Sequence, residues 1–178
     1  MAGKYTITTK GDGVSATREM MIAFLNTGTA DAPVWSAMGT KVTESSVEYN
    51  WGIETITDIL GVSHAKASTA EMTQSFDDSE IVGGDAVMNH LLDLAIVQKN
   101  AALLVNQDML LVHTYLKDES GNAFAERYPA SAVVPTTVGG EGGAALVSTI
   151  DVTYGGARAV GSAKVADGTV TFTPEVEV

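Results

Sequence analysis

Short segments in which apolar and polar residues alternate, separated by glycine and acidic turns, dominate this chain. Residues 20–25 are apolar on both faces, which is typical of a central or covered strand. From Ala70 onward, the alternation places Ala70, Met72 and Phe76 on one face of a strand and polar residues on the other. The pattern therefore predicts a mainly β protein.

Further strands are expected in the second half of the chain. Residues 109–116 are largely apolar on both sides of a strand, and the turn at 118–122 predicts a hairpin that returns into Ala123. Inward-facing positions are expected on two later strands at Leu146, Ile150, Val152, Tyr154, Val170 and Phe172. Gly155-Gly156 and Asp167-Gly168 suit tight turns with positive φ, so the last part is predicted as a run of hairpins.

One segment has the periodicity of a helix. Asp85 follows two glycines and is a candidate N-cap, so we predict a helix over residues 85–99. Its apolar residues span an arc of about 200°, wider than the stripe of ~100° that packing on one sheet requires. The excess width predicts a second covering surface, such as a neighbouring subunit. The alternative is that two parts of the same chain cover the helix.

Two regions show little regular periodicity. Residues 1–18 hold scattered Gly, Ser and Thr, and are predicted to form an N-terminal arm that orders against a partner. Residues 40–81 form a long loop or hairpin region with one or two strand signals, yet their apolar residues, among them Trp51, Ile59 and Leu60, are too many for a solvated loop. With the strands of 107–178, these parts are expected to make a single domain, 1–178.

Charge and composition exclude several classes of protein. The chain has 178 residues, 22 acidic against 10 basic side chains and a formal net charge of −12, which argues against a surface that grips nucleic acid. Cysteine is absent, which excludes disulfide frameworks and thiol catalysis. We see no signal-peptide pattern and no apolar run near the ~20 residues of a membrane span, so we expect a cytoplasmically made protein without a membrane segment.

Candidate catalytic residues are few. Ser63 and Lys66 match the S-x-x-K pattern of penicillin-binding enzymes, but the accompanying K-T-G element is missing. The histidines His64, His90 and His113 lie far apart, without the spacing of zinc ligands. We therefore expect no catalytic site, no metal and no cofactor, and predict that the protein is not an enzyme.

Two other clusters each allow a functional and a structural explanation. Asp77, Asp78, Glu80 and Asp85 could bind calcium, but they lack the spacing of an EF-hand loop, and a charged turn before a capped helix is favoured. The aromatic residues Trp35, Tyr49 and Trp51 could stack on a ligand, although aromatic residues in strands belong more often to a core or an interface.

The order of segments resembles the major tail tube proteins of tailed bacteriophages. The strand at 20–25 is followed by WSAMG at 35–39, VTESSVEYN at 42–50 and ETITDILG at 54–61, and the likeness continues through Phe76 and Asp77 into the helix near Asp85. The resemblance implies an antiparallel β-sandwich or partly rolled barrel, flanked by one α-helix. It also implies that a long inter-subunit loop helps hexameric rings to stack into a hollow tube.

The same resemblance implies a place in the virion tail, assembled in the host cytoplasm. Expected partners are other copies of the chain, a tape measure protein, a terminator and, in contractile tails, a sheath. DNA would pass through the lumen to the host without specific binding, because an acidic wall repels phosphates. Glu48 and Glu71 are candidates for lining that lumen; the alternative is that they solvate an outer face.

Two other functions are kept as alternatives. A β-sandwich carbohydrate- or host-binding module would use Trp35 and Trp51 as stacking residues. A hydrolase would use Ser63 as its nucleophile.

Overall fold

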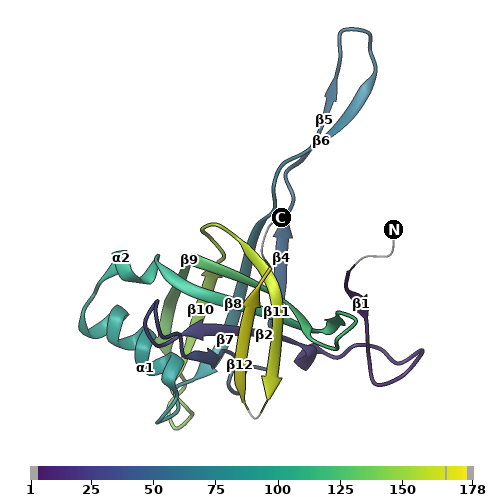
Figure 1. The fold of residues 1–178 in the computed structure, drawn as a ribbon. Helices are drawn as coiled ribbons and strands as arrows, with labels where there is room; N and C mark the ends of the chain where they lie inside the picture. Colours follow the sequence, from purple (N-terminus) through teal and green to yellow (C-terminus); the bar gives the residue numbers. More distant parts are fainter. Residues whose placement is uncertain (1–3, 167, 176–178) are drawn as a thin grey trace.

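The computed structural model describes residues 4–166 and 168–175, and shows a mainly antiparallel β fold with a short helical segment at one side (Figure 1). The predicted fold class is confirmed. The strands are β1 Thr6–Ile7, β2 Met21–Asn26, β3 Trp35–Ala37, β4 Val47–Asn50, β5 Ile53–Thr57, β6 Ser63–Ala67, β7 Glu71–Glu80, β8 Gln107–Lys117, β9 Ala123–Gly139, β10 Val147–Thr153, β11 Ala159–Ala166 and β12 Thr169–Pro174. The helices are a 3₁₀ turn Arg18–Met20, α1 Ala86–Leu92, a π-helical segment Asp93–Val97 and α2 Ala101–Leu104.

The long strand β9 joins the two halves of the sheet. Its first half pairs with β8 and β11, and its second half pairs with β10. The β8–β9 register shifts between Tyr128 and Ser131, at Pro129, because proline has no N–H to donate to the ladder. One half-sheet therefore runs β3-β2-β8-β9-β11-β12 and the other runs β9-β10-β7-β4, so that the two can pack as layers.

Strand β8 is buried on both of its faces, as its sequence predicts. Met109 and Leu111 point into the main core, between the half-sheets and the helices, whereas Leu110 and Val112 point into a second cluster. The last strand, β12, comes close to β3 and curls this half-sheet around the second cluster. Its Val170 is buried there and Phe172 packs against the cluster, which confirms the inward positions expected for them.

The expected N-cap begins helix α1. The Asp85 carboxylate accepts hydrogen bonds from the backbone N–H groups of Val87 at 2.9 Å and Met88 at 3.0 Å. Helix α1 buries Val87, Met88 and Leu91 in the main core, and the chain continues as the π-helical segment, in which Leu94 is buried. Ile96 and Val97 stay exposed, so part of the excess apolar width lies on the surface.

Two details of the C-terminal strands differ from the sequence expectation. Leu146 is exposed, because it lies just before β10, which begins at Val147. Gly155-Gly156 does not close a hairpin, since β10 pairs with β7 and β9 whereas β11 pairs with β9 and β12. Gly168 has φ 75° between β11 and β12, and its predicted turn partner Asp167 lies outside the described residues.

The long region 40–81 holds more strand than its sequence indicates. Strand β4 pairs with β7 at the edge of the body, and β5 and β6 pair with each other as a separate two-stranded sheet. Of the predicted N-terminal arm, residues 1–3 lie outside the described residues and β1 pairs with the end of β8. Among the described residues, the helices are all too short or too polar to cross a membrane.

Candidate functional site

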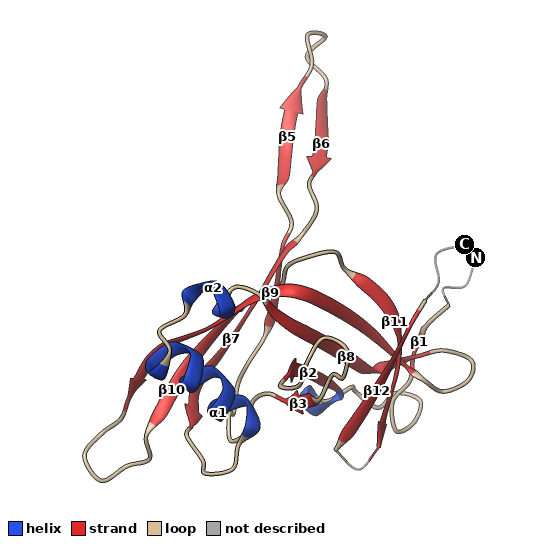
Figure 2. Ribbon diagram, turned by 60° about the vertical axis from the view of Figure 1, so that its left-hand side comes forward, coloured by secondary structure: helices blue, strands red, loops and turns tan. Residues whose placement is uncertain are grey.

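The hairpin β5–β6 is the most unusual feature of the molecule. It extends away from the body in both views (Figures 1 and 2), and every residue of its two strands is exposed. A single two-stranded hairpin is marginally stable in water unless something packs against it. The hairpin is therefore the first candidate for a surface that another molecule covers.

The register of the hairpin gives it two chemically different faces. Direct cross-strand partners in an antiparallel pair lie on the same face. The uncharged face holds the pairs Ile53/Ala67, Thr55/Ala65 and Thr57/Ser63, and the other face holds Glu54/Lys66 and Ile56/His64. One face is thus suited to water, and the other carries only small or β-branched side chains.

The tip of the hairpin is an ordered turn with apolar side chains. The Asp58 carboxylate accepts hydrogen bonds from the backbone N–H of Leu60 at 2.8 Å and of Val62 at 2.9 Å, and lies 2.8 Å from His64 Nε2. The hydrogen bond from His64, followed by the one from the Val62 N–H, lowers the pKa of Asp58. Gly61 has φ 79°, which a glycine adopts without strain. Ile59 is 102% exposed and Leu60 82% exposed on this turn.

A cavity opens at the opposite end of the hairpin. Tyr49 and Trp51 stack there with ring centroids 6.4 Å apart and an angle of 12° between the rings. They line a cavity of about 380 Å³. The other lining residues that matter for its chemistry are Met72, Glu126, Tyr128, Tyr154 and Arg158. Trp51 is 58% exposed, so its ring is available to a partner.

The polar floor of this cavity is a buried hydrogen-bonded network. The Glu126 carboxylate accepts hydrogen bonds from Tyr128 Oη at 2.6 Å and Arg158 Nε at 2.7 Å, and lies 3.2 Å from His113 Nε2. Burial alone would raise the pKa of Glu126, but the hydrogen bonds from His113, Tyr128 and Arg158 together lower it to about 2. Glu126 is thus a paired anion and part of a rigid floor.

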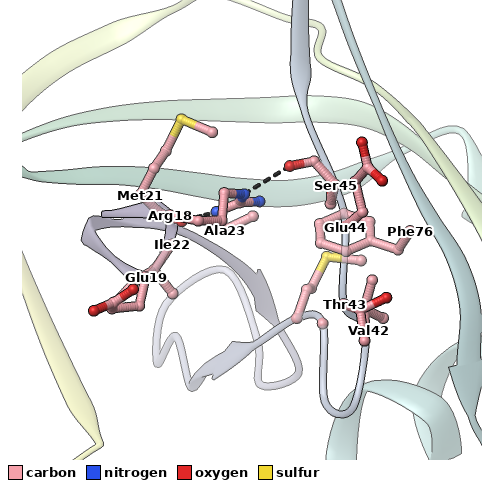
Figure 3. Close-up of a pocket in the computed structure, with 12 residues that line it drawn as sticks. Arg18, Glu19, Met21, Ile22, Ala23, Val42, Thr43, Glu44, Ser45 and Phe76 are labelled. Carbon is pink, nitrogen blue, oxygen red and sulfur yellow. Dashed lines mark hydrogen bonds between the residues drawn. The ribbon is translucent and has the colours of Figure 1, made fainter. Parts of the chain in front are cut away.

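A second cavity, of about 420 Å³, lies between β2 and residues 42–45 (Figure 3). The guanidinium group of Arg18 donates to the carbonyl oxygens of Ser45 at 2.6 Å and Met21 at 2.5 Å. These bonds tie the segment before β4 to the start of β2. Because the Arg18 cation is engaged with these backbone oxygens, we interpret the residues around this cavity as structural and not as a ligand-binding site.

None of the three histidines, all in the part of the chain that the structure describes, hydrogen-bonds to Ser63, the candidate nucleophile. Ser63 Oγ lies 3.3 Å from Thr57 Oγ1, whereas His64 lies on the other face of β6 and contacts Asp58. The other two histidines are far from it: His90 contacts Gln107, and His113 belongs to the Glu126 network. The structure therefore does not assemble a serine triad around Ser63.

The acidic residues considered for calcium are dispersed. Asp85 caps α1, Glu80 pairs with Lys41, and Asp78 occupies a turn-like position in β7 with φ 51°. Over residues 4–166 and 168–175, no group of three or more His, Asp or Glu side chains is arranged to hold a metal ion. Asp77, Asp78 and Glu80 all lie within strand β7, so the expected charged turn before the helix is wrong for these three, whereas Asp85 caps the helix as expected.

The two tryptophans do not share one platform. Trp35 lies in β3 and packs against the second cluster, and its ring centroid is 5.7 Å from the guanidinium carbon of Arg127. Trp51 follows β4, at the other end of the strand order. Glu48 and Glu71 are both exposed on the neighbouring strands β4 and β7. The Glu126 network is not predicted from the sequence; the available signal is the charged Glu126 directly after the apolar residues 123–125.

Comparisons with known proteins give likeness of fold only. No protein-family model matches the chain, and no curated protein matches it in sequence. The chain is similar to a solved structure of the anti-feeding prophage tube-terminating cap, with a TM-score of 0.46 and 12% identity, covering 94% of this chain and 97% of that one. It is also similar to a chain of the PVC sheath-tube complex of an extracellular contractile injection system in the extended state. That match has a TM-score of 0.47 and 9% identity over 85% of this chain and 94% of that one.

Proposed function

We propose that this protein is a structural subunit that assembles with copies of itself into the tube of a phage-like tail. The observation that carries the proposal is the β5–β6 hairpin, which displays Ile59 and Leu60 in water at the end of an ordered arm. Contiguous exposed apolar groups of this kind mark interaction surfaces. A neighbouring subunit would cover them and would stabilise the hairpin at the same time.

The edges of the sheet support assembly in a ring. Strand β3, of three residues, and β4, of four residues, end the strand order of the body. Short edge strands still present unpaired backbone groups that another chain can pair with. A contact between unlike surfaces generates a closed ring when its rotation closes. The sequence resemblance supplies the finer proposal of hexameric rings stacked into a tube, together with other tail proteins.

The net charge fits a conduit for DNA. At −12 the chain repels phosphates, so an acidic lumen would let a genome slide past without binding it. Glu48 and Glu71 remain our candidates for that lining, and their exposure on adjacent strands is compatible with it. Their alternative place is the outer surface of the tube.

Electron microscopy and sedimentation of the concentrated protein test the proposal. We expect rings or tubes from the full chain. The matched control replaces residues 53–67 with an Asn-Gly turn, which is feasible because Ser68 N donates to Gly52 O at 3.0 Å and the two ends already meet. This variant should fold, as judged by circular dichroism, and stay monomeric. A full chain that is monomeric at every concentration would contradict the proposal, as would a deletion variant that forms normal tubes.

A carbohydrate-binding module is the second candidate, and the exposed Trp51 ring stacked on Tyr49 favours it. Aromatic rings at the mouth of a cavity suit the apolar faces of sugars. A glycan array separates the two functions. Specific glycan binding that is lost in Trp51→Ala, by a protein that never assembles, would establish the module in place of the tube subunit.

A further inference from the structure

The hairpin has an unmatched surface at each of its ends. At the tip, Ile59 and Leu60 are almost fully in water, and at the base an open cavity is lined by Tyr49 and Trp51. We propose that the Ile59–Leu60 tip of one copy inserts into the Tyr49–Trp51 cavity of the next copy. This inference rests on the proposed function, and it names the surfaces that would join two subunits.

The chemistry of the cavity suits an aliphatic guest. Tyr49, Trp51 and Met72 contribute two aromatic rings and a thioether to its lining. The polar groups of the floor already bond to one another, since Glu126 accepts from Tyr128 and Arg158. An incoming Ile or Leu side chain would therefore remove apolar surface from water while the Glu126 carboxylate keeps its hydrogen bonds from Tyr128 and Arg158.

The tip cannot fill the cavity of its own molecule. Strands rise about 3.3 Å per residue, so the path from Trp51 to Ile59 spans roughly 25 Å. The hairpin runs outward along this whole length in both views (Figures 1 and 2). Only a second copy can bring the two surfaces together.

Charge also favours this contact within an acidic protein. Residues 59–63, Ile-Leu-Gly-Val-Ser, carry no charge, although the whole chain has a net charge of −12. Arg158 lines the cavity with a side chain that is 51% exposed, and the tip turn is built on the carboxylate of Asp58. Arg158 is already paired with Glu126 and Asp58 contacts His64, so docking would bring together charges that have partners and would add little repulsion.

The consequence is a head-to-tail contact. Tip and cavity are different surfaces at opposite ends of one hairpin, so each copy can donate a tip and accept another. Such heterologous contacts repeat from copy to copy until they close or form a filament. The length of the hairpin would then set the offset between joined subunits.

Disulfide trapping tests the contact, because the natural chain has no cysteine. Leu60→Cys copies are mixed with Thr69→Cys copies, Thr69 being an exposed residue of the cavity lining, and assembled under mild oxidation. The matched control uses Ser120→Cys, on an exposed turn between β8 and β9. A disulfide needs its two Cα atoms within about 7 Å. We expect a Leu60→Cys/Thr69→Cys heterodimer on non-reducing gels, confirmed by mass spectrometry, and at most a trace with Ser120→Cys.

Tryptophan emission gives an independent readout. Trp35→Phe leaves Trp51 as the only tryptophan of a chain that has two. Its emission should shift to shorter wavelength on assembly, and adding Ile59→Ser and Leu60→Ser should raise the concentration needed for that shift by at least about tenfold. Tubes that form without the trapped disulfide and without the shift would overturn this inference and leave the proposed function standing. The absence of any assembly would overturn both.

Discussion

Strand β8 and the hairpin β5–β6 are both antiparallel β-structure, but they are stabilised in opposite ways. Residues 109–112 of β8 are 0% exposed and contact a hydrophobic cluster on each face. Every strand residue of the hairpin is exposed, and its order comes from cross-strand pairs and from the hydrogen bonds that Asp58 accepts. The body is thus stabilised by burial, whereas the hairpin depends on local geometry.

This difference separates folding from assembly. Removing an apolar side chain from β8 lowers the free energy of unfolding of one molecule, because that side chain is buried. Removing one from the hairpin leaves this free energy unchanged and weakens only the contact with a partner. A variant can therefore lose assembly while keeping its fold.

Hydrogen exchange should show the largest contrast. In the monomer, amides of β8 should exchange only through global unfolding, whose free energy is about 5–15 kcal/mol, whereas amides of β5 and β6 should exchange through local opening near 0 kcal/mol. Mass spectrometry of exchanged peptides measures both. After assembly, the hairpin peptides should become protected. Equal protection of the two regions in the monomer would show that the hairpin is not an independent local unit.

Two leucine truncations, one in the core and one at the tip, should differ widely in their effect on stability. Leu111→Ala in β8 should lower the free energy of unfolding by about 2–5 kcal/mol, because it leaves a cavity in the main core. Leu60→Ala at the exposed tip should change it by less than about 0.5 kcal/mol. Urea denaturation monitored by circular dichroism measures both values. A large loss of stability in Leu60→Ala would mean that the tip packs against its own body.

The same contrast explains what the sequence could predict. The continuous apolar run of β8 and the alternation in β7 mark buried faces, and the Asp85 cap marks a helix start, because burial and capping each leave a local signal in the sequence. The hairpin is exposed on both faces, so Ile53–Thr57 and Ser63–Ala67 lack a regular apolar period and resemble a long loop. The clue that was available is the turn chemistry of Asp58 and Gly61.

The buried network and the cavity could not be predicted from the sequence for another reason. Glu126 and Arg158 are 32 residues apart and meet because β9 pairs with β11. Tyr49 reaches the same cavity from β4, at the opposite end of the strand order. Local patterns do not encode which strands become neighbours, so neither the buried network nor the cavity could be assembled from spacing alone.

Acid should weaken the buried network on the floor of the cavity. The pKa of Glu126 in the folded protein is about 2, below its ordinary value of 4.5, so its contribution is complete above about pH 5 and is lost as the pH falls toward 2. We expect this carboxylate to contribute about 3 kcal/mol to the free energy of unfolding at neutral pH. Urea denaturation at several pH values between these limits measures it.

Glu126→Gln isolates that contribution. The variant should be less stable than the natural chain at neutral pH, and the difference should shrink as the solution becomes acidic. Glu119→Gln, which makes the same charge change on an exposed turn, is the control and should leave the acid profile unchanged. A difference for Glu126→Gln that does not depend on pH would mean that its charged form is not the stabilising species.

Two aspartates give the smallest contrast and the most closely matched one. Asp85 accepts hydrogen bonds from the backbone N–H groups of Val87 and Met88, and Asp58 accepts them from those of Leu60 and Val62. All four distances lie between 2.8 and 3.0 Å. Asp85 begins a helix packed on the core, so Asp85→Ala should cost about 1 kcal/mol of global stability. Asp58 orders only the exposed tip, so Asp58→Ala should leave the Tm unchanged while the tip amides exchange faster. If the tip must be pre-ordered to dock, this variant should also assemble more weakly, whereas Asp85→Ala should assemble normally at temperatures where it is folded. The reverse outcome, a lower Tm for Asp58→Ala with normal assembly, would mean that the turn supports the body and plays no part in joining subunits.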